Sequence, residues 1–231
     1  MASRFALYTA PPADHPLHKF AAEWLGHDPE TGETHVPAPA AGLSAARIAA
    51  LTGEPRRYGF HGTLKPPFRL AEGCDEAMLI GALETFVRDR RPLRLPPLKL
   101  VLLGRFLALQ PSAPSPEMDA LAADCLRAFD RFRAPASAAE LAKRRAAGLT
   151  PRQDAYLSVW GYPYVLEDFR LHFTLTGRID DAAERMALQQ HLGEATRAFA
   201  EQEYIVDGIC LFVQATADSG FRIAGRYRFG G

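Results

Sequence analysis

Two stretches of the chain share one pattern: YGFHGTLK at residues 58–65 and FRLHFTLT at residues 169–176. Each contains His-x-Thr-Leu, and each half of the 231-residue chain carries one copy. Alternate side chains of a β-strand point to the same side, so the polar residues of each stretch are predicted to share a face. These are His61, Thr63 and Lys65 in the first copy, and His172, Thr174, Thr176 and Arg178 in and just after the second. The apolar residues between them are predicted to face the core.

The segments before these stretches repeat as well. Short strands are predicted at 4–8 and 105–109, and each is followed by a Pro-containing turn and a helix, at about 15–25 and 116–132. In the second of these helices, apolar residues recur at steps of three and four, which indicates a helix with one buried face.

The segments after the two stretches also correspond. Each stretch leads to a predicted helix, near 75–87 and 181–199, whose first residues include acids that suit the positive end of the helix dipole. Further strands are predicted at 98–103, 209–215 and 222–229, and the last two flank an Asp-Ser-Gly turn typical of a hairpin.

Two successive strand–helix–strand–helix–strand units predict an α+β fold with two pseudo-symmetric lobes. We expect antiparallel sheets that face a central cleft, with the two His-x-Thr strands opposite each other across it. The chain is expected to be one bilobal domain with approximate halves 1–103 and 104–231. Two looser stretches, 27–57 and 134–168, remain, the second with a predicted short helix at 138–147. The sequence leaves open whether they close over a ligand as a lid.

Composition narrows the class of protein. With 27 basic and 27 acidic side chains the net charge is zero, so we do not expect a long nucleic acid or an anionic membrane as partner. There is no apolar run long enough to span a membrane and no secretion signal, so a cytoplasmic protein is expected. Three widely spaced cysteines predict reduced thiols, and neither a metal site nor a cofactor is expected. Oligomeric state is left open.

Paired histidines suit the cleavage of a phosphodiester. That reaction needs one proton removed from the attacking oxygen and another given to the leaving oxygen, and imidazole can do either because it titrates near neutrality. A threonine hydroxyl two residues further on can donate to a phosphate oxygen, and Lys65 or Arg178 can offset developing negative charge. Two histidines on opposite sides of one phosphorus permit in-line attack without a metal.

The duplicated His-x-Thr pattern resembles the 2H (two-histidine) phosphoesterase superfamily, which includes RNA 2′,5′-ligase/cyclic phosphodiesterases and plant cyclic nucleotide phosphodiesterases. The longer strings HGTLKPPF, at 61–68, and WGYPY, at 160–164, resemble more narrowly the branch encoded in bacterial phosphonate-utilisation operons. The resemblance extends over nearly the whole chain. The two prolines that follow Lys65 depart from the best-known members, and they predict that this strand stops there or lies at an edge.

The resemblance implies roles for four residues: His61 and His172 form the acid/base pair, and Thr63 and Thr174 bind the phosphate. We therefore expect a phosphoric diester hydrolase that is independent of metal and acts on a small cyclic phosphodiester. The operon branch suggests a phosphorylated ribose cyclic phosphate from phosphonate breakdown. Which histidine is the base depends on how the substrate lies, so the sequence does not assign it.

Two alternatives stay open. A nucleoside 2′,3′-cyclic phosphodiesterase or RNA-end-processing enzyme would use the aromatic residues at 156–164 to stack on a base. A nucleotide- or RNA-binding module would keep the cleft without turnover, although both motifs are intact. Lys65 and Thr176 are further candidates for phosphate binding, and Tyr8, Tyr162 and Arg178 for substrate contact. Arg144 and Arg145 are expected on a solvated helix face.

Overall fold

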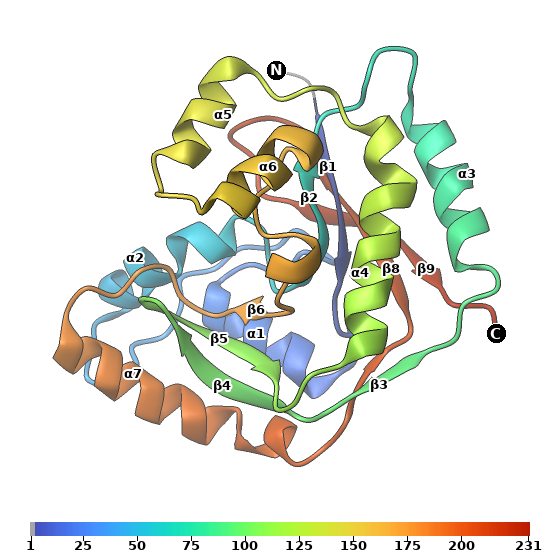
Figure 1. Cartoon of the computed structure of the whole chain (residues 1–231). Coiled ribbons are helices and arrows are strands. Elements are labelled where there is room, and N and C mark those ends of the chain that lie inside the picture. Colours follow the sequence, from blue (N-terminus) through green and yellow to red (C-terminus); the bar gives the residue numbers. More distant parts are fainter. Residues whose placement is uncertain (1–2) are drawn as a thin grey trace.

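A seven-stranded antiparallel sheet runs through the computed structural model, which describes residues 3–231 (Figure 1). A separate two-stranded ribbon pairs β3 (Leu93–Leu95) with β7 (Tyr204–Val206). The α+β class is therefore confirmed. In spatial order the strands of the large sheet are β4 (Leu98–Leu103), β5 (Phe106–Pro111), β6 (Phe173–Thr174), β2 (Gly62–Phe68), β1 (Arg4–Thr9), β8 (Gly208–Gln214) and β9 (Arg222–Arg228).

The order of the strands reflects the repeat in the sequence. At the centre lie β2 and β6, which carry the two His-x-Thr motifs, and each is flanked by the first strand of its own half, β1 or β5. The last strands of the halves are exchanged, because β4 pairs with β5 and β8 pairs with β1. The halves 1–103 and 104–231 therefore interlock in one sheet.

This arrangement corrects one expectation about the cleft. We expected the motif strands on separate sheets that face each other, whereas the structure places them side by side, paired through Gly62 and Phe173. Strand β6 is only two residues long, so the pairing between the two motif strands is narrow. The two histidines consequently approach one another from neighbouring strands.

Seven α-helices accompany these strands in the described part of the chain. The predicted helices are found within a few residues of their expected ends, whereas α2 and α6 fall in stretches that we expected to be loose. Both begin at a serine or threonine N-cap, but they bury few residues, which is why their sequences lack a clear apolar period. The helices are α1 (Pro16–Leu25), α2 (Ala45–Arg56), α3 (Glu76–Val87), α4 (Pro116–Phe129), α5 (Ala138–Arg145), α6 (Pro151–Trp160) and α7 (Ala182–Ala195).

The main core gathers the apolar residues of the motif strands, as predicted. Leu64, Leu171, Phe173 and Leu175 are buried there together with apolar faces of α1, α3, α4 and α7. A smaller cluster on the other side of β1 contains Tyr8 with aromatic neighbours from the C-terminal part of the chain. No helix among residues 3–231 is both long and apolar enough to cross a membrane.

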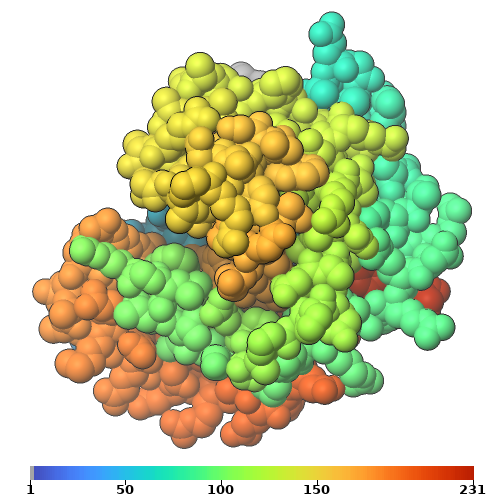
Figure 2. All heavy atoms as spheres, in the orientation of Figure 1, coloured from blue at the N-terminus to red at the C-terminus, as the bar shows by residue number. Residues whose placement is uncertain are grey.

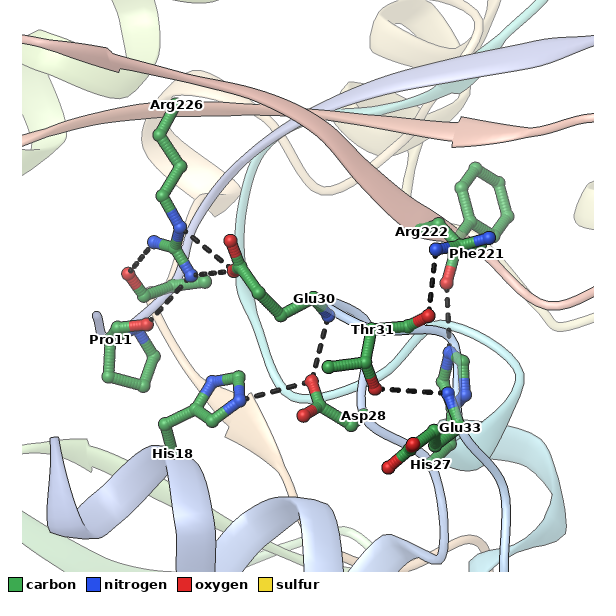
Figure 3. Close-up of polar contacts among 11 residues, drawn as sticks. Pro11, His18, His27, Asp28, Glu30, Thr31, Glu33, Phe221, Arg222 and Arg226 are labelled. Atoms are coloured by element: carbon green, nitrogen blue, oxygen red, sulfur yellow. Dashed lines mark hydrogen bonds and ion pairs between the residues drawn. The ribbon is translucent and has the colours of Figure 1, made fainter. Parts of the chain in front are cut away.

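Polar contacts fix the first looser stretch in place (Figure 3). Arg226 on β9 donates to the Glu30 carboxylate at 2.7 and 3.0 Å. The His18 imidazole lies 3.1 Å from the Asp28 carboxylate. The segment from residue 27 to 31 is thus tied to β9 and to α1, which favours a static wall over a closing lid.

Candidate active site

The two motif histidines are held in the same way. The Nδ1 atom of His61 lies 2.8 Å from the carbonyl oxygen of Gly59, and that of His172 lies 2.8 Å from the carbonyl oxygen of Arg170. A carbonyl can only accept, so each Nδ1 carries a hydrogen and each Nε2 is left to take up or release a proton. In both cases the partner is the residue two positions earlier, so the two sequence motifs hold their histidines with the same hydrogen bond.

Both histidines line one cavity of about 410 Å³. Figure 2 shows the surface hollowed between the α5–α6 segment, in yellow to orange, and the green β4–β5 hairpin. The structure brings most of the predicted site residues together there. The cavity wall includes His61, His172, Thr63, Thr174, Thr176, Tyr8, Tyr162 and Arg178.

Aromatic rings enclose His61 on several sides. The Tyr8 ring stacks on it with centroids 3.8 Å apart, and the rings of Tyr58 and Phe212 each lie 6.0 Å away. Because burial penalises the charged imidazolium, the pKa of His61 falls from 6.5 to about 4; the Gly59 carbonyl opposes this shift and His172 adds to it. His61 is therefore neutral at pH 7 in the empty cavity.

Lys65 does not reach the cavity, which corrects its predicted place beside His61 and Thr63. The register of β1 against β2 shifts between the pairs Tyr8–Thr63 and Leu7–Lys65, so one step on β1 spans two residues on β2. Such a bulge reverses the alternation of side chains beyond it. Lys65 consequently turns inward and is 1% exposed, with its Nζ 3.1 Å from the Asp130 carboxylate.

Thr176 and Arg178 lie at the margin of the site. Thr176 is buried and its Oγ1 accepts a hydrogen bond from the backbone N–H of Leu107 at 2.9 Å, so the hydroxyl already has a structural partner. Arg178 is exposed and pairs with Asp180 at 2.7 Å. Both line the cavity, but neither is as free to bind a phosphate as Thr63 and Thr174.

Two arginines line the cavity although the sequence did not predict them there. Arg4 belongs to β1, and Arg144 belongs to α5, where we expected a solvated face. The guanidinium of Arg144 packs over the Tyr162 ring at 4.9 Å from its centroid. Nothing in the local sequence indicates this position, because it results from the way α5 and the segment after α6 fold over the sheet.

A second, largely apolar cavity of about 420 Å³ adjoins the first. The two share His172, Thr63, Phe106 and Tyr162, so a ligand at the histidines could extend into either space. Leu166, in the wall of the apolar cavity, has a φ of 54°, a backbone conformation that residues other than glycine rarely adopt.

Gly62, between the catalytic candidates His61 and Thr63, allows the two motif strands to meet. A Cβ at this position would lie 2.7 Å from Leu171 Cδ1 and 3.1 Å from Phe173 Cζ. Beyond Gly62 no pairing joins β2 to β6, and this open edge accommodates the two prolines. We expected β2 to stop at the prolines or to lie at an edge there, and it continues to Phe68 with this edge unpaired within the described chain.

Among residues 3–231 no group of three or more His, Cys, Asp or Glu side chains is placed to hold a metal ion.

The family described as "Protein of unknown function (DUF1045)" matches residues 63–222, which include Thr63, His172 and Thr174 and begin just after His61. The chain belongs to the DUF1045 family. Two curated relatives are named ribose 1,5-bisphosphate phosphokinase PhnN. The protein from Janthinobacterium sp. (strain Marseille) is 40% identical over 202 residues, which are 85% of this chain and 45% of the relative. The protein from Laribacter hongkongensis (strain HLHK9) is 34% identical over 222 residues, which are 95% of this chain and 50% of the relative.

This DUF1045 chain thus spans about half the length of the curated relatives it matches. Solved structures similar to it include E. coli LigT complexed with 3′-AMP, at 15% identity and a TM-score of 0.46, and a phosphoesterase at 13% identity and a TM-score of 0.44. Both alignments cover 100% of each chain.

Proposed function

We propose that this DUF1045 protein is a metal-independent phosphodiesterase that hydrolyses a small cyclic phosphodiester, with His61 and His172 as the acid/base pair. One observation carries the proposal: both imidazoles line the same cavity, and a carbonyl bond on Nδ1 leaves Nε2 of each as its proton-transfer atom. Proton transfer of this kind accelerates a reaction by roughly a hundred- to ten-thousandfold.

The low pKa of His61 suits it to act as the base. In the proposed step His61 Nε2 takes a proton from water while the water oxygen forms a bond to phosphorus. The bond from phosphorus to one ring oxygen breaks, and that oxygen receives a proton from His172 Nε2. The ring opens to a phosphate monoester and a free hydroxyl. Thr63 and Thr174, two residues after each histidine, donate hydrogen bonds to the non-bridging oxygens.

A ribose cyclic phosphate is the substrate we favour. The curated relatives carry the name of a kinase that acts on ribose 1,5-bisphosphate, which supports ribose phosphate chemistry for the family. The sequence of this chain contains no Gly-x-x-x-x-Gly-Lys-Ser/Thr string, the loop with which many kinases hold nucleotide phosphates. Its own site is better suited to opening a cyclic ester than to phosphoryl transfer from a nucleotide.

A nucleoside 2′,3′-cyclic phosphate is the second candidate, and the apolar cavity beside His172 favours it. Phe106, Tyr162 and Tyr164 in the wall of that cavity provide flat faces on which a base can stack. Phosphorus NMR with both classes of substrate distinguishes the two candidates.

The test is phosphorus NMR of the purified protein in excess EDTA, with ribose cyclic phosphates and nucleoside 2′,3′-cyclic phosphates in parallel. We expect one class to be converted, with the rate reduced at least a hundredfold in His61→Ala and in His172→Ala. The matched control is His35→Ala, because His35 is exposed and lies outside the cavity. Activity that requires an added metal would contradict the mechanism, and binding without any turnover would favour the non-catalytic module.

A further inference from the structure

Two arginines of the cavity that holds both histidines have no acidic partner in the part of the chain that the structure describes. Within residues 3–231 neither Arg4 nor Arg144 forms an ion pair with a carboxylate, whereas Arg178, which lines the same cavity, is held by Asp180. Both Arg4 and Arg144 are half-buried. A guanidinium is always charged in a protein and presents several donors in a plane, so an unpaired one in a cavity is suited to an anion.

Arg4 lies away from the proposed catalytic centre along β1. Tyr8 pairs with Thr63 beside His61, whereas Phe5 pairs with Phe68 at the far end of β2. Four residues of strand separate Arg4 from Tyr8, a distance of roughly 13 Å between their backbones. The Arg4 backbone is therefore set apart from the histidines, although burial raises the pKa of Tyr8 and the Arg4 charge still acts to lower it.

Arg144 lines the same cavity from α5, which is anchored near the end of β2 that pairs with Phe5. Helix α5 is anchored there because Glu140 accepts hydrogen bonds from Arg69 at 2.6 and 2.9 Å, and Arg69 directly follows the end of β2. A second ion pair, Arg145 to Asp154 at 2.6 Å, joins α5 to α6. Of the three cations of α5, Arg145 is thus engaged elsewhere and Lys143 is exposed outside the cavity, whereas Arg144 packs on Tyr162 in the cavity wall.

Arg4 is held in its position too. Its Nε donates to the Gln214 side chain at 2.7 Å, and its guanidinium lies 5.4 Å from the centre of the Phe221 ring. Phe221 is fixed in turn, because its carbonyl accepts from His27 at 2.9 Å (Figure 3) and its N–H donates to Arg57 at 2.8 Å. The Arg4 side chain keeps further donors for a ligand, since Nε is the only one of its donors engaged within residues 3–231.

We propose that Arg4 and Arg144 form a second anion site that binds a phosphate monoester of the substrate. The inference rests on the proposed function, and it names the substrate class: a small sugar that carries a cyclic phosphodiester and, at its other end, a separate phosphate. The histidines act on the cyclic ester while the arginines bind the phosphate that does not react. Hydrolysis then yields a sugar with two phosphate monoesters.

The first test compares a ribose cyclic phosphate with and without a phosphate on its free hydroxymethyl group. We expect Arg4→Gln and Arg144→Gln to lower kcat/KM at least tenfold for the doubly phosphorylated substrate, about 1.4 kcal/mol, and less than twofold for the other. Lys143→Gln is the matched control, because it removes the same charge from the neighbouring exposed position of α5, outside the cavity. An equal loss on both substrates, or no loss, would overturn the proposal.

The second test does not depend on turnover. Ribose 5-phosphate carries only the second anion, so calorimetry should show at least tenfold weaker binding in Arg4→Gln and Arg144→Gln, with wild-type binding in Lys143→Gln and in His61→Ala. Arg4→Lys, which retains a cation, should recover part of the affinity. If this pattern holds while neither cyclic substrate is hydrolysed, the proposed function is wrong and the anion site stands. Equal binding by all variants would refute the anion site whatever the turnover.

Discussion

The Tyr8 ring lies almost flat on the His61 imidazole, with an angle of 19° between the two planes. Tyr8 is fully buried in the small aromatic cluster, and the pair is brought together by the register of β1 against β2, in which Tyr8 faces Thr63. One ring face of the proposed base is therefore covered by protein, and its carbonyl bond to Gly59 fixes the remaining rotation. Tyr8, which we expected to contact substrate, is thus placed to orient the histidine.

Replacing Tyr8 tests this role. Tyr8→Leu should lower kcat about tenfold or more with a smaller change in KM, because His61 loses the surface that orients it, whereas Tyr8→Phe retains the ring and should stay within about threefold of wild type. Steady-state kinetics on the converted cyclic substrate provide the measurement, with thermal unfolding to show that both variants are folded. A loss in Tyr8→Phe as large as that in Tyr8→Leu would indicate that the hydroxyl acts directly.

The low pKa of His61 predicts two pH effects. If His61 is the base, the acidic limb of kcat/KM against pH should have its midpoint near pH 4, since that limb reports the free enzyme. Tyr8→Leu admits water to the ring and should move the limb toward pH 6.5. An acidic limb in the wild type that already lies near pH 6.5 would contradict the assignment of His61 as the enclosed base.

The free energy of unfolding should also depend on the protonation of His61. The unfolded chain protonates His61 near pH 6.5, whereas the folded protein does so only near pH 4. Between these values the unfolded state binds more protons, so the free energy of unfolding should fall as pH is lowered from 6.5 to 4. His61→Asn should lose less stability than wild type over this window in denaturant titrations, and an identical loss would show that other groups dominate.

Gly62 should resist even the smallest substitution. Gly62→Ala places a methyl group 2.7 Å from Leu171 Cδ1, and overpacking of this kind costs about 1–3 kcal/mol. Because the clash separates β2 from β6, we also expect kcat to fall at least tenfold as the two histidines move apart. Gly81→Ala is the control, since a Cβ there meets nothing within 4 Å in helix α3. Wild-type stability and turnover in Gly62→Ala would show that the strand contact tolerates the methyl group.

The buried Lys65 should matter for stability and not for phosphate binding. Lys65→Met leaves Asp130 paired with Arg133 at 2.8 Å, so we expect kcat and KM within about threefold of wild type. Asp130→Asn leaves the Lys65 ammonium buried without its counter-charge and should cost about 3–5 kcal/mol. Denaturant unfolding and kinetics check the pair. A large rise in KM for Lys65→Met at unchanged stability would restore Lys65 to the phosphate site.

Much of the secondary structure was predictable because it depends on local pattern. The apolar steps of three and four in α4 and the alternation around His172 each report which face is buried, and both were found as expected. The sequence did not predict helices α2 and α6 because few of their residues are buried, so their apolar residues show no helical period.

Lys65 shows where local reasoning failed. Its predicted face assumed strict alternation, and a bulge against β1 reverses that alternation between Thr63 and Lys65. A bulge depends on how two strands pair, and the partner strand lies more than fifty residues earlier in the chain. The inward turn of Lys65 is stabilised by Asp130, which comes from a third segment.

The sequence by itself determined which residues carry the proposed chemistry, because each His-x-Thr motif places a histidine and a threonine two residues apart, on one face of an extended segment. Only the tertiary structure decided how they meet: β2 and β6 lie side by side in one sheet, Tyr8 covers His61, and Arg4 and Arg144 enter the cavity from segments that share no motif. Alternation and periodicity are local properties of the chain. The meeting of distant segments depends on strand order, register and the packing of α5, which no short stretch of sequence encodes.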